Sequence, residues 1–238
     1  MPKKDPNITD PIEILPLEKK ELLYQSLAEF LSDNKRQLFD RLAPMRTRHI
    51  TLLLEDIYQP HNASAVMRSC DCFGIQDLHV VATRNAYNPN DQVSMGSSKW
   101  VDYFSHSDIS TAYNYLREKG YRIVATTPHT NDTTISELDL SQPVALVFGT
   151  ELTGLTQEAI SNADAYVKIP MFGFTESFNI SVSAALSLYD TTTRLRSNET
   201  IPWRLSESDI LDIKLHWCLS AINDGQAIMK QLLERLGL

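Results

Sequence analysis

Glycine and cysteine are both scarce in this chain. Eight glycines occur in 238 residues, and Gly149, Gly154 and Gly173 fall within the single stretch 144–190. A chain that uses glycine sparingly tends to place it where the backbone turns sharply or approaches a ligand, so this stretch is expected to carry chemistry. The three cysteines are too few for a structural zinc site, and they predict free thiols in a reducing cytoplasm.

Long apolar runs are absent as well. No segment approaches the length of a membrane span, and residues 1–14 contain no apolar secretory segment. We therefore expect a cytoplasmic protein with no membrane partner. A hydrophobic content of 42% and a charged content of 22% are ordinary for a globular protein, and the length suits one large domain with or without appendages.

Positive charge is also in short supply, because the net charge is −8. This balance argues against a strongly basic nucleic-acid-binding protein, but one segment differs from the rest. Residues 34–49 contain five basic side chains against the single acid Asp40; the basic ones are Lys35, Arg36, Arg41, Arg46 and Arg48. By itself such a cluster is more often a solvated helix face than a surface that binds phosphate.

Several common catalytic and nucleotide-binding motifs are missing. No Gly-x-Gly-x-x-Gly pattern follows a strand, and Leu155–Thr156 stand where a phosphate-binding loop after Gly154 needs Lys-Ser/Thr. The chain has no Gly-x-Ser-x-Gly, no His-Glu-x-x-His and no Cys/His pair with metal-ligand spacing, so no metal site is expected.

Short apolar runs alternate with segments of helical periodicity, which predicts an α/β fold with an open, mostly parallel sheet. Strands are expected at 50–54, 78–82, 122–126, 144–148 and 166–169. Helices are expected at 17–42 with a break near 33–34, and at 64–73, 110–119, 156–162, 181–196 and 206–236, the last interrupted near Gly225. Ligands of such sheets bind beyond the carboxyl ends of the strands, here residues 55–62, 126–129, 149–154 and 170–179.

Three segments at these strand ends together resemble a known family. Residues 62–74 (NASAVMRSCDCFG) have an Asn followed by Ala, Arg and Gly three, six and twelve positions later. Residues 148–154 (FGTELTG) have Gly-x-Glu followed by a glycine, and residues 169–184 (IPMFGFTESFNISVSA) have Ile-Pro-Met, a glycine and Ser-x-Asn. In order and spacing they are similar to the three motifs of the SpoU/TrmH family of RNA 2′-O-methyltransferases, in the SPOUT superfamily. The resemblance covers about 47–196.

The resemblance implies more about the fold than the sequence pattern does. Family members close the C-terminal part of the sheet into a deep trefoil knot and form homodimers whose sites are completed across the interface. It implies three regions: a helical N-terminal extension at 1–48 that contacts tRNA, a knotted methyltransferase core at 49–196, and a helical C-terminal extension at 197–238.

The family binds S-adenosylmethionine (AdoMet) in the knot, largely through backbone groups. The matching positions here are Thr126, Gly149, Ile169, Met171 and Phe178. Phe178 replaces the usual leucine of the family, which implies a small change in the adenine-binding wall without loss of binding.

The resemblance also assigns the residues of the reaction. Arg68 is expected to grip the substrate phosphate, with proton removal assisted by that phosphate or a nearby group, because an arginine is normally always protonated. Asn62 is expected in the loop before a helix, as its N-cap, with Ser177 and Asn179 orienting Arg68 or the ribose. Glu151 is expected to fix Arg68 or an arginine of a partner subunit. Taken singly, each of these residues is more often a helix cap or a surface ion pair.

The activity that these motifs imply is methylation of a ribose 2′-hydroxyl in tRNA, at guanosine 18 of the D-loop. In that context Arg41, Arg46 and Arg48 become the expected tRNA contacts. Two alternatives stay open: the same chemistry on ribosomal RNA or another tRNA position, and a catalytically silent RNA-binding module on the same scaffold.

Overall fold

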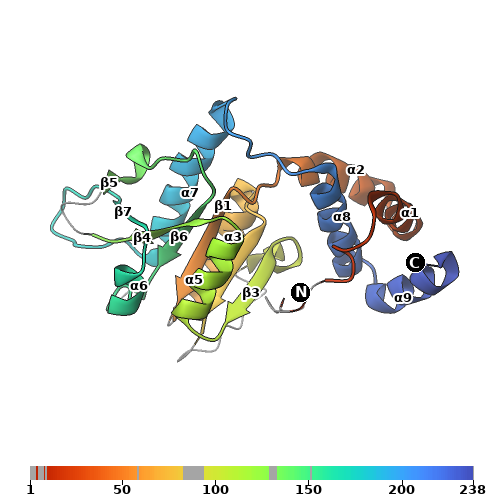
Figure 1. Ribbon diagram of the computed structural model, residues 1–238, viewed down its shortest axis with the longest axis horizontal. Helices are drawn as coiled ribbons and strands as arrows, with labels where there is room; N and C mark the ends of the chain where they lie inside the picture. The colour runs from red at the N-terminus through yellow and green to blue at the C-terminus, as the bar shows by residue number, and fades with distance from the viewer. Residues whose placement is uncertain are drawn as a thin grey trace. The chain divides into compact units, whose positions relative to one another are not determined.

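The computed structural model describes residues 4, 8, 10–57, 59–82, 94–128, 133–150 and 152–237 (Figure 1). The chain divides into two compact units. One contains 48–203 together with Lys4, and the other contains the helices of 10–47 and 204–237.

The first unit is built on a seven-stranded sheet in the order β3-β2-β1-β6-β4-β7-β5, and every strand pair is parallel. The strands are β1 (Ile50–Glu55), β2 (Asp77–Val81), β3 (Asp102–His106), β4 (Arg122–Thr126), β5 (Thr133–Thr134), β6 (Val144–Phe148) and β7 (Ala165–Lys168). The central strands β1 and β6 are buried along their whole length, as expected of parallel strands covered on both faces. The predicted open, parallel α/β sheet is confirmed.

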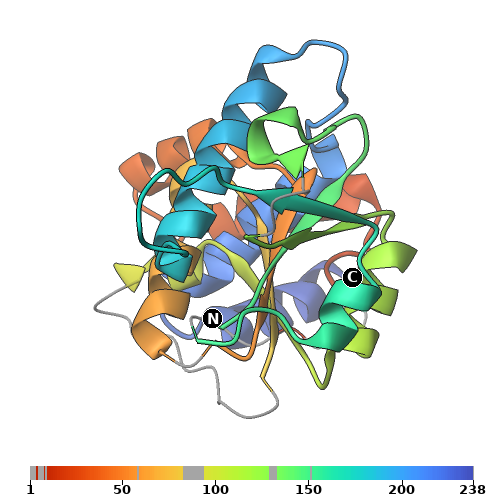
Figure 2. The same cartoon turned by 90° about the vertical axis from the view of Figure 1, so that its left-hand side faces the viewer.

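Helices cover both faces of this sheet. They are α3 (Pro60–Phe73), α5 (Ile109–Glu118), α6 (Gln157–Ser161) and α7 (Ile180–Ser197), with 3-10 turns η2 (Ser97–Lys99) and η3 (Ile135–Glu137). Leu52 and Leu54 of β1 pack in the same cluster as the apolar residues of α3 and α7, whereas Leu53 packs with those of α5 and α6. Figure 2 shows the two helix layers on either side of the strands.

The predicted strands at 122–126 and 144–148 have the observed bounds, whereas β3 and β5 were not predicted. The sequence of β3, DYFSH, alternates between buried and half-buried positions and so lacks a continuous apolar run. The helix expected from Ser64 begins at Pro60. Proline suits the first helical position because its missing N–H would be unpaired there anyway.

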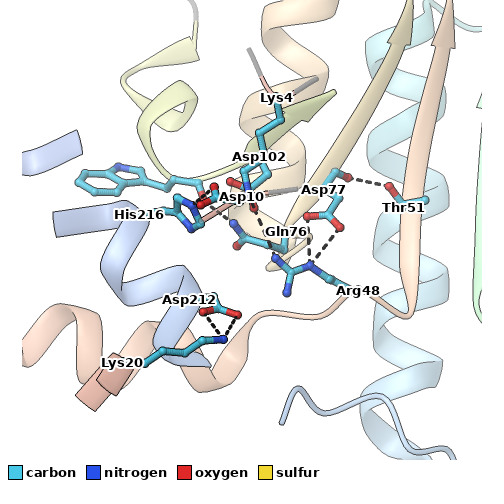
Figure 3. Close-up of polar contacts among 11 residues, drawn as sticks. Lys4, Asp10, Lys20, Arg48, Thr51, Gln76, Asp77, Asp102, Asp212 and His216 are labelled. Carbon is cyan, nitrogen blue, oxygen red and sulfur yellow. Dashed lines mark hydrogen bonds and ion pairs between the residues drawn. The ribbon is translucent and has the colours of Figure 1, made fainter. Parts of the chain in front are cut away.

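The amino ends of β1, β2 and β3 are joined by a network of buried charges (Figure 3). Arg48 Nε lies 3.1 Å from Asp77 Oδ2 and its Nη2 lies 3.4 Å from Asp102 Oδ2, which also pairs with Lys4 Nζ at 3.3 Å. Burial raises the pKa of Asp77, and the Arg48 charge opposes this shift. These pairs fix the edge of the sheet opposite to the carboxyl ends of its strands.

The second unit brings the helices from both ends of the chain together. Its elements are α1 (Leu17–Ala28), α2 (Asp33–Leu42), η1 (Ala43–Met45), α8 (Glu207–Ala221) and α9 (Gly225–Leu236). The buried Lys20 of α1 lies 2.7 Å from Asp212 Oδ1 of α8 (Figure 3). Its ammonium group also donates to Ser208 Oγ of α8 at 2.8 Å. The described helices include none that is long and apolar enough to cross a membrane.

Two buried histidines sit side by side on β2 and β3. His79 Nδ1 lies 3.0 Å from His106 Nε2, and His79 stacks on Phe104 at 4.8 Å between ring centroids. Desolvation lowers the pKa of His79 well below its usual value and that of His106 to about 4, although Asp108 opposes the second shift. Both imidazoles are therefore neutral in the folded protein at neutral pH.

This pair makes the stability of the protein pH-dependent. The folded-state pKa values lie below the unfolded value of about 6.5, so the unfolded state binds more protons below that pH. Above about pH 6.5 the two histidines leave the free energy of unfolding independent of pH. As the pH falls from about 6.5 toward 4, the free energy of unfolding decreases by at most about 1.4 kcal/mol per pH unit for each histidine. Urea unfolding at several pH values measures this slope. His106→Asn should flatten it, the exposed His61→Asn should not, and equal slopes for all three proteins would contradict the assignment.

Candidate active site

The three motif segments meet at the carboxyl edge of the sheet, where β1, β4, β6 and β7 end. The first motif forms α3, which follows β1, and the second is the loop between β6 and α6. The third runs from the end of β7 into α7, and α7 packs on α3. The sheet therefore brings together segments that are more than a hundred residues apart in the sequence, at the edge where parallel sheets bind ligands.

Asn62 and Asn179 connect the first and third motifs directly. Asn179 Nδ2 donates to Asn62 Oδ1 at 3.2 Å, while Asn179 Oδ1 accepts from the Ser181 N–H at 2.9 Å as the N-cap of α7. Asn62 is only 8% exposed. Its predicted role as the N-cap of its helix is wrong, because α3 has already begun at Pro60 and its N-cap is Gln59.

Arg68 lies on a different face of α3 from Asn62, as their separation of six residues requires. Its side chain is exposed and has no hydrogen-bond or ion-pair partner among the described residues. The structure therefore does not bring Arg68 into contact with Asn62 or Asn179. Within the described part of the chain this exposed guanidinium has no acceptor, so it is available for an anionic ligand such as a phosphate.

The second motif is a tight loop that only glycine permits at its base. A Cβ on Gly149 would lie 2.2 Å from the carbonyl carbon of Gly154, and Gly154 has a φ of +68°. The N–H of Thr150 donates to the Gly154 carbonyl and the N–H of Gly154 to the Thr150 carbonyl, both at 3.0 Å. The predicted catalytic residue Glu151 lies outside the described residues. Ser177, another predicted catalytic residue, is exposed and has no hydrogen-bond partner among the residues described.

The five residues predicted to hold the cofactor lie at or after the carboxyl ends of strands β4, β6 and β7. Thr126 ends β4, where its hydroxyl donates to the Val147 carbonyl at 2.7 Å, and Gly149 follows β6. Ile169 and Met171 follow β7 and are half-buried, and Phe178 is 41% exposed. The edge thus offers backbone groups and apolar side chains. The described residues contain no cluster of His, Cys, Asp or Glu that could hold a metal ion.

Sequence reasoning did not single out Glu55, the last residue of β1. It is 3% exposed, and its carboxylate accepts both from the N–H and from the hydroxyl of Thr156, at 2.9 and 2.6 Å. The available signal was an acid directly after the apolar run of 50–54 (ITLLL), at an edge where ligands bind.

The three arginines predicted to contact RNA have different surroundings. Arg41, in the last turn of α2, is exposed. Arg46 is only 4% exposed and its guanidinium lies 5.5 Å from the ring centroid of Trp217, so it is placed for packing and cannot present its charge to a phosphate. Arg48 is engaged with Asp77 and Asp102. The structure thus argues against the expected RNA contacts of Arg46 and Arg48.

Known proteins are similar to this chain over the region that contains the three motif segments. The sequence model of the SpoU rRNA Methylase family matches residues 49–189. The tRNA (guanosine(18)-2′-O)-methyltransferase of Borreliella burgdorferi is 37% identical over 202 residues, which cover 85% of this chain and 92% of that protein.

Two solved structures share the fold. The A. aeolicus TrmH/SpoU tRNA modifying enzyme has a TM-score of 0.72 at 26% identity, covering 85% of this chain and 99% of that one. A SpoU methyltransferase of Streptomyces viridochromogenes, crystallised in complex with AdoMet, has a TM-score of 0.57 at 24% identity, covering 67% of this chain and 62% of that one.

Proposed function

Because this chain belongs to the SpoU methylase family, we propose that it transfers a methyl group from AdoMet to the ribose 2′-hydroxyl of guanosine 18 in tRNA. The choice of guanosine 18 follows the name of the Borreliella burgdorferi relative, whose similarity extends over 202 residues and so beyond the matched methylase region 49–189. Such a substrate belongs to the cytoplasm.

The observation that carries the proposal is the hydrogen bond between Asn62 and Asn179. It joins α3, which presents Arg68, to the start of α7, which follows the loop proposed to hold the cofactor. Groups that must act on two different substrates, a ribose and a methyl donor, are thereby fixed to one another at the carboxyl edge. Proximity and alignment of this kind supply much of the rate in a displacement reaction.

The residues at this edge fit the methyl donor. An adenosine needs an apolar slot with backbone donors and acceptors, and Thr126, Gly149, Ile169, Met171 and Phe178 would provide them. AdoMet supplies an electrophilic methyl group on a sulfonium. The backbone around Gly149 leaves no room for a side chain at its base, which suits a loop that lies against a ligand.

The chain's own residues would act on the nucleophile. Arg68 grips a phosphate next to the target ribose and so aligns its 2′-oxygen with the methyl group. As the oxygen–carbon bond forms and the sulfur–carbon bond breaks, the hydroxyl proton passes to that phosphate or to a nearby group. Asn62, Asn179 and Ser177 orient the ribose or Arg68, and Glu151 fixes Arg68 or an arginine of a partner subunit.

The proposal includes a trefoil knot around the cofactor site. In support, β7 lies between β4 and β5, two strands that the chain visits in direct succession, and the segment after β7 returns to pack α7 on α3. The last strand of the chain is thus inserted between two strands that are consecutive in the sequence. Arg194 of α7 adds to this arrangement, because it donates to the carbonyls of Leu138 and Ile135 at 2.8 and 2.9 Å.

The proposal also includes a homodimer built on α7. While one face of α7 packs on α3, a second carries exposed apolar side chains at helical spacing: Val182, Leu186 and Tyr189. Phe178, which precedes the N-cap of α7, is also exposed. Phe172 and Phe174 of the preceding loop are almost fully exposed as well. A contiguous exposed apolar surface of this kind is typical of an interface.

Methyl transfer to an unmodified tRNA transcript, with ribosomal RNA in parallel, tests the reaction. We expect label from AdoMet at the 2′-oxygen of guanosine 18, mapped by resistance to alkaline cleavage, and none in a transcript with adenosine at that position. Arg68→Ala should lower kcat by roughly 100-fold, about 2.7 kcal/mol, because an alignment made through the phosphate is lost.

Cys72→Ala, on an exposed part of the same helix, is the matched control and should retain activity. Label only in ribosomal RNA would keep the chemistry and move the target. Absence of label in both RNAs would contradict the proposed activity.

Sedimentation of the protein tests the dimer. The wild type should have twice the chain mass of 27.0 kDa, whereas Leu186→Glu should weaken self-association by roughly 100-fold, about 2.8 kcal/mol, because it buries a charge. Ser110→Glu, at an exposed polar position of α5 on the other side of the sheet, should leave the dimer intact. A wild-type monomer at micromolar concentration would contradict this part of the proposal.

Binding of tRNA at several salt concentrations tests the contribution of the basic segment. Arg41→Gln should weaken binding by about 3- to 10-fold and reduce the salt slope by about one, as expected for the loss of one phosphate contact. Arg235→Gln, an equal charge change at an exposed position of α9, serves as the control. Equal effects of the two variants would indicate a general charge effect instead of a contact at α2.

A further inference from the structure

Glu55 is a buried carboxylate that the proposed chemistry does not use. It ends β1 at the carboxyl edge and is 3% exposed. Burying a carboxylate is costly unless hydrogen bonds replace its water. In the described part of the chain, the donors that replace this water belong to a single residue, Thr156.

Both oxygens of Glu55 are engaged by Thr156. The Thr156 N–H donates to Oε2 at 2.9 Å and its hydroxyl donates to Oε1 at 2.6 Å. The same hydroxyl accepts from the Ala159 N–H at 3.2 Å as the N-cap of α6. The carboxylate therefore fixes the residue at which the loop from β6 turns into a helix.

The loop between these anchors is closed at its base. In the sheet Leu54 pairs with Phe148, so Glu55 and Gly149 are the next residues of two adjacent strands. Gly149 begins the loop, the paired backbone groups of Thr150 and Gly154 close it, and Leu155 is buried beneath it. Thr156 follows immediately, so the contact with Glu55 sets where the returning end of the loop lies relative to β1.

We infer that Glu55 is a positioning residue that holds the 149–156 loop in the shape required to bind AdoMet, acting through Thr156 and touching neither substrate. This inference rests on the proposed function, because it assigns Gly149 to the cofactor. The contact with Thr156 requires two acceptor oxygens at position 55, so a side chain of the same size is not sufficient. Glutamine at position 55 would present an NH2 group, which cannot accept a hydrogen bond, to one of the two Thr156 donors.

Four variants separate this role from a general loss of packing. Glu55→Gln keeps the size of the side chain and removes one acceptor. Thr156→Val removes the hydroxyl and keeps the N–H, while Thr156→Ser keeps both donors. Ser161→Ala removes the exposed contact between Gln157 and Ser161 on the same helix and is the matched control.

The measurements are AdoMet affinity by calorimetry, and kcat and the KM of each substrate for methyl transfer to tRNA. Glu55→Gln and Thr156→Val should each raise the AdoMet Kd and KM by about 10-fold, with the KM for tRNA within twofold of the wild type. Combining Glu55→Gln with Thr156→Val should weaken AdoMet binding no more than the more severe single variant, because both changes break the same contact. Thr156→Ser and Ser161→Ala should match the wild type.

A purely structural role would give a different result. Lower melting temperatures and a smaller active fraction, with an unchanged AdoMet Kd in the folded protein, would overturn the inference, as would equal losses for AdoMet and tRNA. If the wild type binds AdoMet but methylates neither tRNA nor ribosomal RNA, the proposed function fails, and the binding measurements still decide the role of Glu55. A wild type that binds no AdoMet would overturn both.

Discussion

The packing of α7 on α3 is the constraint on which the candidate site depends. The two helices cover the same face of the sheet although they begin 120 residues apart, at Pro60 and Ile180. Their starts meet at the carboxyl edge, and only this arrangement lets Asn179 cap α7 with one side-chain atom while donating to Asn62 with another. An asparagine suits this position because its amide has both a donor and an acceptor.

The two edges of the sheet use polar groups differently. At the amino edge, Arg48 pairs with the buried Asp77 and Asp102, and such a network has its charges satisfied within the protein. On α3, which begins at the carboxyl edge, Arg68 is exposed and the described residues offer it no acceptor, whereas Glu55 at that edge accepts two hydrogen bonds from Thr156. Binding of an anionic ligand requires a charged side chain that is not already paired within the protein. The paired Arg48 and the exposed Arg68 therefore agree with the proposed reaction, in which Arg68 binds a phosphate.

The helical unit depends on a different kind of contact. Lys20 and Asp212 are a buried ion pair that ties the N-terminal helix α1 to α8, nearly 200 residues later. Ser208 and the carbonyl of Glu13 accept the remaining hydrogen bonds of the ammonium group, which is why its burial is tolerated. Trp217 contacts Phe39 edge-on and packs against Arg46, so one aromatic side chain of α8 covers both α2 and the segment after it.

Local patterns in the sequence were sufficient for much of the fold. Continuous apolar runs predicted the buried strands β4 and β6 with their observed bounds, because burial on both faces leaves no alternation. They failed for β3, whose sequence DYFSH has no continuous apolar run, and the observed start of α3 at Pro60 is four residues earlier than predicted. Asn62, Arg68 and Asn179 were found through motif spacing, whereas Glu55 lay only within the predicted strand end 55–62 and belonged to no motif.

The sequence by itself determined the continuous apolar strands, most of the helices, the family, and the segments that carry the chemistry, since each of these follows from residues close together in the chain. Only the tertiary structure decided which side chains are used for packing and which are left for a ligand. Arg41, Arg46 and Arg48 look alike in the sequence, yet one is exposed, one packs on Trp217 and one is paired with buried aspartates. The physical reason is that burial and pairing depend on contacts between distant segments, and local composition does not encode them.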